Sequence, residues 1–340
     1  MADRSVHPGD SLGDLRAAPQ MGVRVSAPVL SVVVPVKDEE DGIAPFVERV
    51  SKALAEVDDP AATSFEILFI DDGSTDRTME AIRTARATNG KVRAISLSRN
   101  FGKEAALTAG IDHARGEAVL PIDVDMQDPP EVIGAMLAKW REGHDIVYGV
   151  RTNRETDSLP KRLTADLYYR AHNRLSSDKI PEHAGDFRLL DRKVIDVIRA
   201  MPERNRFMKG LFSWAGFRQA SVPYRRRARE IGKTKFNYWK LWTFAIDGIT
   251  SASTVPLRVW SYIGGIAAIF ALGFALLLVV RTLLWGTQVP GYASLMVAIL
   301  FMGGLQLLSL GILGEYVGRI LIETKRRPLY VVRETLGDDD

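Results

Sequence analysis

Short apolar runs alternate with amphipathic stretches over the first two thirds of the chain. The runs are rich in β-branched and aliphatic residues, which is typical of buried strands. They cover residues 31–36, 65–70, 92–97, 118–122, 145–150 and 185–190. The stretches between them place apolar residues at helical spacing over 43–54, 78–87, 104–113 and 133–140. This alternation predicts an α/β fold, with a mainly parallel sheet covered by helices on both faces.

The last third has a different pattern, because two long runs contain no charged residue. We predict membrane-spanning helices at about 262–281 and 292–314, since each run is long enough to cross about 30 Å of hydrocarbon. Two buried core helices are the alternative, which the length and adjacency of the runs disfavour. Arginine and lysine residues flank the outer ends of the pair, and the positive-inside rule then places those ends in the cytoplasm.

These patterns divide the chain into five parts. A disordered arm over 1–28, which lacks the apolar core of a signal peptide, precedes a cytoplasmic α/β domain over 29–235. An interfacial amphipathic helix or linker follows over 236–256, then the two spans within 257–318 and a cytoplasmic tail over 319–340. The sequence therefore predicts a multi-pass protein of the cytoplasmic (inner) membrane, with the α/β domain and both termini in the cytoplasm.

The amino-acid composition excludes several kinds of functional site. The chain contains no cysteine, which excludes disulfides, zinc–thiolate sites and thiol nucleophiles. The five histidines show no metal-ligand spacing. Basic and aromatic residues are interleaved over 225–240, a pattern that can indicate nucleic-acid binding, but their position before an apolar span favours anionic lipid headgroups and phosphates. A helix over 163–175, apolar on one side and basic on the other, fits a membrane surface and a place on the sheet equally well.

Acidic side chains follow three of the first four predicted strands, namely Glu39, Asp71 with Asp72, and Asp123 with Asp125. The carboxyl ends of parallel strands lie at one edge of a sheet, where such folds bind ligands. Asp123 and Asp125 are two positions apart, so their side chains lie on the same side of an extended chain. Two carboxylates held that close repel each other unless a cation lies between them. Mg²⁺ or Mn²⁺ needs one or two such oxygens plus substrate phosphates. An acidic surface turn is the alternative for this pair, and a turn or helix cap for Asp72.

Two common phosphate-binding motifs are absent. No Gly-x-Gly-x-x-Gly follows the first strand, which disfavours a dinucleotide-binding fold. Gly102 and Lys103 are followed by Glu104 in place of Ser or Thr, and the preceding glycine of a P-loop is missing.

Taken in order, the motifs resemble one known family. They read SVVVPVKDEE, DDGSTD, DVDMQDPPE, GDFRLLDR and REIGKTKF, followed by the two-span C-terminus. This series is similar to that of the polyprenyl-phosphate glycosyltransferases, members of glycosyltransferase family 2 with the Rossmann-like GT-A fold. Dolichyl-phosphate mannose synthase and bactoprenol glucosyltransferase are familiar members. The resemblance covers about residues 30–325, and it is carried by the order of the motifs because each alone is weak.

The resemblance implies roles for individual positions. It implies a nucleotide-sugar site made of Pro35, Lys37, Glu39, Asp71, Asp72, Asp123, Arg229 and Lys235. It implies that Asp123, Asp125 and Gln127 bind Mg²⁺ or Mn²⁺. It implies that the acceptor phosphate is bound by Arg151, Arg162 and Arg229. The catalytic residues would be Asp125, Asp186 and Arg151. Asp128 and Glu131 are assigned to a turn and a helix start.

The activity implied is inverting transfer of a sugar from a nucleotide-sugar donor to a polyprenyl phosphate, with undecaprenyl phosphate as the expected acceptor. UDP-glucose is the first choice of donor, and GDP-mannose and modified UDP-sugars are the alternatives. The expected partners are the donor, the acceptor and the lipid bilayer, with no nucleic acid. The pairs Gly264-Gly265 and Gly303-Gly304 would allow close helix packing, which leaves a homo-oligomer open.

Three other classes of protein are disfavoured. A processive polysaccharide synthase would carry a Gln-x-x-Arg-Trp sequence, which this chain lacks, and would need more than two spans. A non-catalytic membrane adaptor would not need the intact Asp-x-Asp-x-Gln and basic motifs. A soluble nucleotidyltransferase would not need the two apolar spans.

Overall fold

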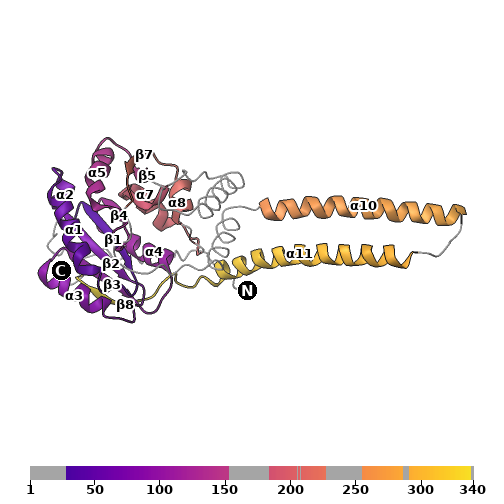
Figure 1. Ribbon diagram of the computed structural model, residues 1–340, viewed down its shortest axis with the longest axis horizontal. Coiled ribbons are helices and arrows are strands. Elements are labelled where there is room, and N and C mark those ends of the chain that lie inside the picture. Colours follow the sequence, from indigo (N-terminus) through magenta and orange to yellow (C-terminus); the bar gives the residue numbers. More distant parts are fainter. Residues whose placement is uncertain are drawn as a thin grey trace, which may run out of the picture.

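The computed structural model describes residues 28–152, 184–204, 206, 208–226, 255–285 and 291–337. Within these residues a mixed eight-stranded sheet has the order β7-β5-β6-β4-β1-β2-β3-β8 (Figure 1). The strands are β1 Leu30–Val36, β2 Phe65–Asp71, β3 Val92–Leu97, β4 Ala118–Pro121, β5 Ile146–Arg151, β6 Ala184–Asp191, β7 Gln219–Tyr224 and β8 Val332–Leu336. All of the strands predicted from the sequence are present, and β7 and β8 are additional.

Helices cover both faces of the sheet. One face packs against α1 Ile43–Ala55, α3 Thr78–Thr88 and α5 Ile133–Arg141, and the other packs against α4 Lys103–His113, α7 Arg192–Ala200 and α8 Met208–Trp214. The short elements α2 Pro60–Thr63 and η1 Pro130–Val132 contact α1 on the first face. Val32 and Val34 of β1 belong to the first core and Val33 belongs to the second, because side chains alternate along a strand. The predicted α/β architecture is therefore confirmed.

The sheet is parallel at its centre and mixed toward its edges. Strand β1 pairs in parallel with β2 and β4, β2 pairs in parallel with β3, and β5 pairs in parallel with β7. Strand β6 runs antiparallel between β4 and β5, and β8 runs antiparallel beside β3. The reversed direction of β6 brings its first residues to the edge where the central parallel strands end.

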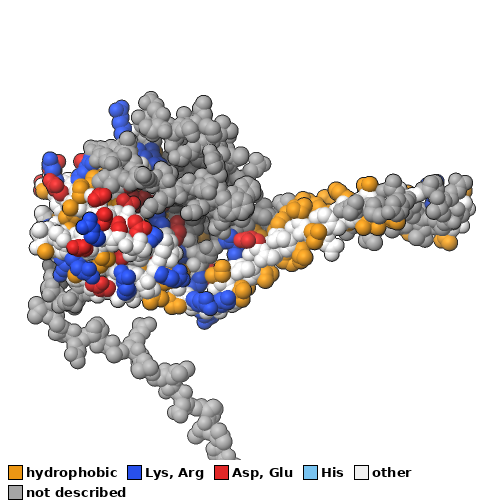
Figure 2. Space-filling model, turned by 60° about the horizontal axis from the view of Figure 1, so that its bottom comes forward, with side chains coloured by type: hydrophobic (Ala, Val, Ile, Leu, Met, Phe, Trp, Pro, Cys, Tyr) orange, Lys and Arg blue, Asp and Glu red, His pale blue; other side chains and the backbone are white. Residues whose placement is uncertain are grey.

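Two long helices, α10 Val255–Trp285 and α11 Tyr292–Lys325, extend side by side away from the sheet (Figure 1). Within the described residues one segment, Val297–Lys325 of α11, is long and apolar enough to cross a membrane; its most apolar 18-residue window has a mean hydropathy of 2.0, and none of that window is buried. Hydrophobic side chains line this extension, whereas charged side chains gather on the α/β domain (Figure 2).

The end of α11 is attached to the α/β domain. The backbone N–H of Arg204 donates to Glu323 Oε1 at 2.9 Å, and Arg204 Nη1 donates to the carbonyl oxygen of Arg327 at 2.8 Å. The chain then returns to the sheet as β8, whereas the sequence predicts only a cytoplasmic tail over these residues. The predicted N-terminal arm up to residue 27 and the interfacial helix over 236–254 lie outside the described residues.

Candidate active site

The loops that follow β1 and β2 are bound to each other. Lys37 Nζ donates to the carbonyl oxygen of Gly73 at 3.2 Å, and the N–H of Asp38 donates to Ser74 Oγ at 2.9 Å. Asp38 has a φ of 53° and accepts the N–H of Thr75 at 2.8 Å. Since the two strands are parallel neighbours, these contacts fix one wall of the site at the carboxyl edge of the sheet.

The two consecutive acids after β2 have different surroundings. Asp71 is fully buried and accepts hydrogen bonds from Ser96 Oγ at 2.7 Å and the N–H of Ser74 at 2.9 Å. Asp72 accepts the N–H groups of Phe101 at 2.7 Å and Gly102 at 2.9 Å. Burial raises the pKa of Asp72, although these two N–H groups act in the opposite direction. Asp71 therefore supports the loop from inside, and Asp72 links the end of β2 to the residues that follow β3.

Gly73 allows this loop to pass close to its neighbour. Its φ of 66° lies in the left-handed region, and a Cβ atom there would lie 2.5 Å from the carbonyl carbon of Arg99. Any other residue would have to displace the backbone that follows β3.

The ammonium group of Lys103 connects the residues after β4 to the start of β6. Lys103 Nζ lies 2.8 Å from the carboxylate of Asp123 and 3.2 Å from Oδ2 of Asp186. Burial alone would lower the pKa of Lys103, but the charges of Asp123 and Asp186 outweigh that effect and raise it. Lys103 therefore stays protonated and neutralises two carboxylates that would otherwise repel each other.

The residues after Asp123 form a tight turn. Asp125 is 7% exposed, and its Oδ1 accepts the N–H of Gln127 at 3.2 Å. Met126, between them, has a φ of 56°, a conformation that costs energy for a side chain of this kind. Glu131 lies in the first turn of η1, as predicted for a helix start, and its carboxylate also pairs with Arg49 at 3.2 Å. The turn thus holds the Asp125 carboxylate beside the end of β4.

A second polar cluster lies where β5 and β7 end. Tyr224 donates a short hydrogen bond from its hydroxyl to Oδ1 of Asp128 and accepts one from Arg151 Nε at 3.3 Å. Arg226 Nε lies 3.9 Å from the same Asp128 oxygen. Asp128 is 5% exposed, and burial raises its pKa against the opposing effects of Tyr224, Arg151 and Arg226. The cluster holds Arg151 beside a buried carboxylate.

Comparison with known proteins identifies the family. The Glycosyl transferase family 2 model matches residues 31–199. An uncharacterized glycosyltransferase of Synechocystis is 50% identical over 91% of this chain and 96% of its own length. The chain belongs to glycosyltransferase family 2.

Other relatives carry more specific names. The prophage bactoprenol glucosyl transferase homolog of Escherichia coli is 48% identical over 89% of this chain and 98% of its own length. Bactoprenol glucosyl transferase of Shigella phage SfII is 48% identical over 90% of this chain and 98% of its own length. A solved mannosyltransferase from Pyrobaculum calidifontis, in complex with GDP-Man and Mn²⁺, is 18% identical over 75% of this chain and 81% of that one, with a TM-score of 0.42, which is too distant to inform function.

In this family 2 glycosyltransferase most of the residues singled out from the sequence lie at one edge of the sheet. Pro35 ends β1 with Val36, and Lys37 and Glu39 follow in the loop tied to the one after β2, where the Glu39 N–H donates to Thr78 Oγ1 at 2.9 Å. Asp123 and Asp186 meet at Lys103, and Arg151 ends β5. The predicted residues Arg162, Arg229 and Lys235 lie outside the described residues.

The donor atoms at the end of β4 fit a hard divalent cation. Asp123 and Asp125 supply carboxylate oxygens, and Gln127 could supply an amide oxygen, which suits Mg²⁺ or Mn²⁺ when the remaining ligands come from substrate phosphates. The described residues contain no group of three or more acidic or histidine side chains arranged to hold a metal by themselves.

Sequence reasoning missed four residues of this site. The sequence indicates Lys103 only as a poor match to a P-loop and Asp128 as a turn residue. It places Arg226 in the basic segment over 225–240, which is assigned to lipid headgroups and phosphates, and it gives Tyr224 no role. A lysine at the start of the helix after β3 was the available signal for Lys103. The others depend on β7, a strand that the sequence pattern does not predict.

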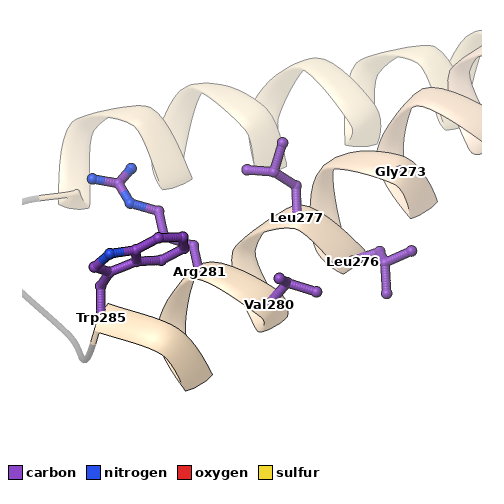
Figure 3. Close-up of a pocket in the computed structure, with 6 residues that line it drawn as sticks. All are labelled: Gly273, Leu276, Leu277, Val280, Arg281 and Trp285. Carbon is purple, nitrogen blue, oxygen red and sulfur yellow. The ribbon is translucent and has the colours of Figure 1, made fainter.

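A shallow hollow of about 470 Å³ lies elsewhere, on the helical extension. Its lining residues, all from α10, are Gly273, Leu276, Leu277, Val280, Arg281 and Trp285 (Figure 3). Since α10 projects away from the sheet, this hollow has no part in the polar site (Figure 1).

Proposed function

We propose that this family 2 glycosyltransferase is a membrane-bound, inverting enzyme that transfers glucose from UDP-glucose to polyprenyl phosphate. The observation that carries the proposal is the match, at 48% identity and over nearly their whole lengths, to proteins named bactoprenol glucosyl transferase. The geometry supports it, because Asp72, Asp123 and Asp125 lie at the ligand-binding edge together with Arg151 at the end of β5.

The acceptor phosphate is already an anion at neutral pH, so the reaction needs no general base. One phosphate oxygen attacks the anomeric carbon, and the bond from that carbon to the nucleoside diphosphate breaks, which inverts the configuration. Arg151 would bind the acceptor phosphate, since a guanidinium pairs with phosphate oxygens and keeps its charge. Tyr224 and Asp128 orient Arg151 for this task.

On the donor side, Asp72 would bind the nucleobase, and Asp123, Asp125 and Gln127 would hold the metal. Mg²⁺ or Mn²⁺, when bound, would neutralise the charge that builds on the leaving diphosphate. Lys103 keeps Asp123 and Asp186 close together at the reacting centre. Positioning and electrostatics would then supply most of the rate enhancement.

The helical pair α10 and α11 would form the membrane anchor. Both helices start or end near the α/β domain and extend away from it together, as expected of a hairpin with both ends in the cytoplasm (Figure 1). Arg319 and Arg326 at the inner end of α11 would face anionic headgroups. Gly264, Gly265, Gly303 and Gly304 have open space where a side chain would be, so a second copy could pack closely there.

A donor screen tests the proposal. Purified full-length protein in lipid nanodiscs is incubated with undecaprenyl phosphate, Mg²⁺ or Mn²⁺, and one nucleotide sugar at a time, and the released nucleotide is measured. We expect release of UDP from UDP-glucose that depends on the acceptor. Release of GDP from GDP-mannose would support the mannosyltransferase alternative. No acceptor-dependent release from any nucleotide sugar would contradict the proposed function.

A further inference from the structure

The segment 330–336 returns from the end of α11 and becomes the outer strand of the sheet beside β3. Ala94 pairs with Leu336 and Ser96 pairs with Glu334 in an antiparallel register. The N–H of Ser98 also donates to the carbonyl oxygen of Val331 at 2.8 Å. We call residues 330–336 the C-terminal segment.

Side chains fix the C-terminal segment on both faces of the sheet. The Tyr330 hydroxyl donates to Asp112 Oδ2 of α4 at 2.9 Å. Arg83 of α3 donates to both oxygens of Glu334, at 2.6 and 2.8 Å. Because α3 and α4 cover opposite faces, the segment is held in one position relative to β3.

One side chain of the C-terminal segment reaches the loop that follows β2. Arg333 Nη2 donates to Ser96 Oγ at 2.7 Å and lies 3.7 Å from Asp71 Oδ2. Ser96 donates in turn to Asp71 at 2.7 Å, and the other oxygen of Asp71 accepts the N–H of Ser74 at 2.9 Å. A continuous series of polar contacts therefore runs from Arg333 to the loop that contains Asp72.

The contact between Arg333 and Asp71 brings a positive charge close to a buried carboxylate. The Asp71 side chain has no exposed surface, and a buried carboxylate is costly unless a positive charge and hydrogen bonds compensate it. Arg333 supplies a positive charge close to this carboxylate, and its own side chain is 51% exposed. The half-exposed position limits the strength of the interaction but keeps the arginine within reach of the buried acid.

We propose that Arg333 is a positioning residue of the donor site, which holds the loop 72–75 in its binding geometry through Ser96 and Asp71. Nucleotide binding thereby depends on a segment that lies beyond the two long helices in the sequence. The inference rests on the proposed function, because it takes the loop after β2 as the nucleobase site. Arg333 acts through other residues, and among the described residues its polar contacts are with Ser96 and Asp71, away from the polar cluster that contains Arg151.

Steady-state kinetics of full-length variants test this role. Arg333→Ala removes the contact, Arg333→Lys keeps the charge, and Thr335→Val, at an exposed position of the same strand, is the control. We expect Arg333→Ala to raise the KM for UDP-glucose about five- to tenfold, at the low end of the usual range for coupling between sites. The KM for undecaprenyl phosphate should not change, and kcat should change less than twofold. Arg333→Lys should recover part of the affinity, and Thr335→Val should behave as wild type.

A double-mutant cycle with Ser96→Ala gives a second readout. Because Arg333 acts through Ser96, Arg333→Ala should add little to the effect of Ser96→Ala on UDP binding measured by calorimetry. Thermal melting of each variant separates loss of binding from loss of folding. Unchanged donor KM in a folded Arg333→Ala protein, equal changes in donor and acceptor KM, or additive effects in the cycle would each overturn the inference.

The same experiments separate this inference from the proposed function. If the wild type binds UDP and transfers glucose while Arg333→Ala does so equally well, only the role of Arg333 fails. If the wild type neither binds UDP nor transfers sugar from any nucleotide sugar, the proposed function fails first.

Discussion

The ammonium of Lys103 lies 2.8 Å from the carboxylate of Asp123, and it holds Asp186 of the neighbouring strand at the same time. We expect Lys103→Met to lower kcat about ten- to hundredfold, because Asp123 and Asp186 would then repel each other at the reacting centre. Transfer assays in nanodiscs measure the effect, with circular dichroism to verify folding. Lys139→Met, which removes a pairing with Glu142 on the surface of α5, is the control and should retain full activity. A fully active Lys103→Met would show that the bridge is dispensable.

Asp125 tests the metal role of the turn after β4. We expect Asp125→Asn to reduce transfer by about a hundredfold or more, since a neutral amide binds a divalent ion far more weakly than a carboxylate. The variant should remain folded and membrane-bound in fractionation experiments. Full activity of the variant with added Mn²⁺ would contradict the metal role.

A variant of Tyr224 tests whether the polar cluster at the ends of β5 and β7 binds the acceptor. Tyr224→Phe removes the hydroxyl that accepts from Arg151 and donates to Asp128. We expect the KM for undecaprenyl phosphate to rise about tenfold, a loss of about 1.4 kcal/mol, because Arg151 loses its orientation. The KM for the nucleotide sugar should stay the same. A selective change in donor KM would instead assign the cluster to the donor side.

A buried ion pair tests stability apart from activity. Arg93 Nη1 lies 2.5 Å from Glu66 Oε2, and neither side chain is more than 7% exposed. We expect Arg93→Met to destabilise the α/β domain by about 3–5 kcal/mol, because Glu66 would keep a buried charge without its partner. The double variant Glu66→Gln with Arg93→Met should recover much of that loss in denaturant unfolding. A single variant as stable as the wild type would show that solvent reaches the pair.

Membrane topology is tested by single cysteines, because the natural chain contains none. In intact cells, Gln288→Cys should react with a membrane-impermeant maleimide added from outside. Asp339→Cys should react only after the cells are permeabilised. Labelling of both positions, or of Asp339→Cys alone, in intact cells would contradict the proposed hairpin orientation.

Much of the α/β domain could be predicted from the sequence, because β-branched runs and helical spacing are local signals. The contact between Lys103 and Asp186 could not, since these residues are 83 positions apart and meet only because β6 runs antiparallel. Strand β8 was missed for a different reason. Its residues Val332–Leu336 read Val-Arg-Glu-Thr-Leu, with three polar residues between two apolar ones, and so short and polar a segment after a long helix resembles a solvated tail.

The late position of β8 in the chain also has a consequence for biosynthesis. Until the ribosome has made α10 and α11, the outer edge of β3 has no partner strand, and an unpaired edge exposes backbone groups that favour aggregation. The sheet can be completed only after both long helices have left the ribosome. Synthesis therefore finishes the catalytic domain last, so a nascent chain arrested before residue 330 should be recognised by chaperones as incomplete.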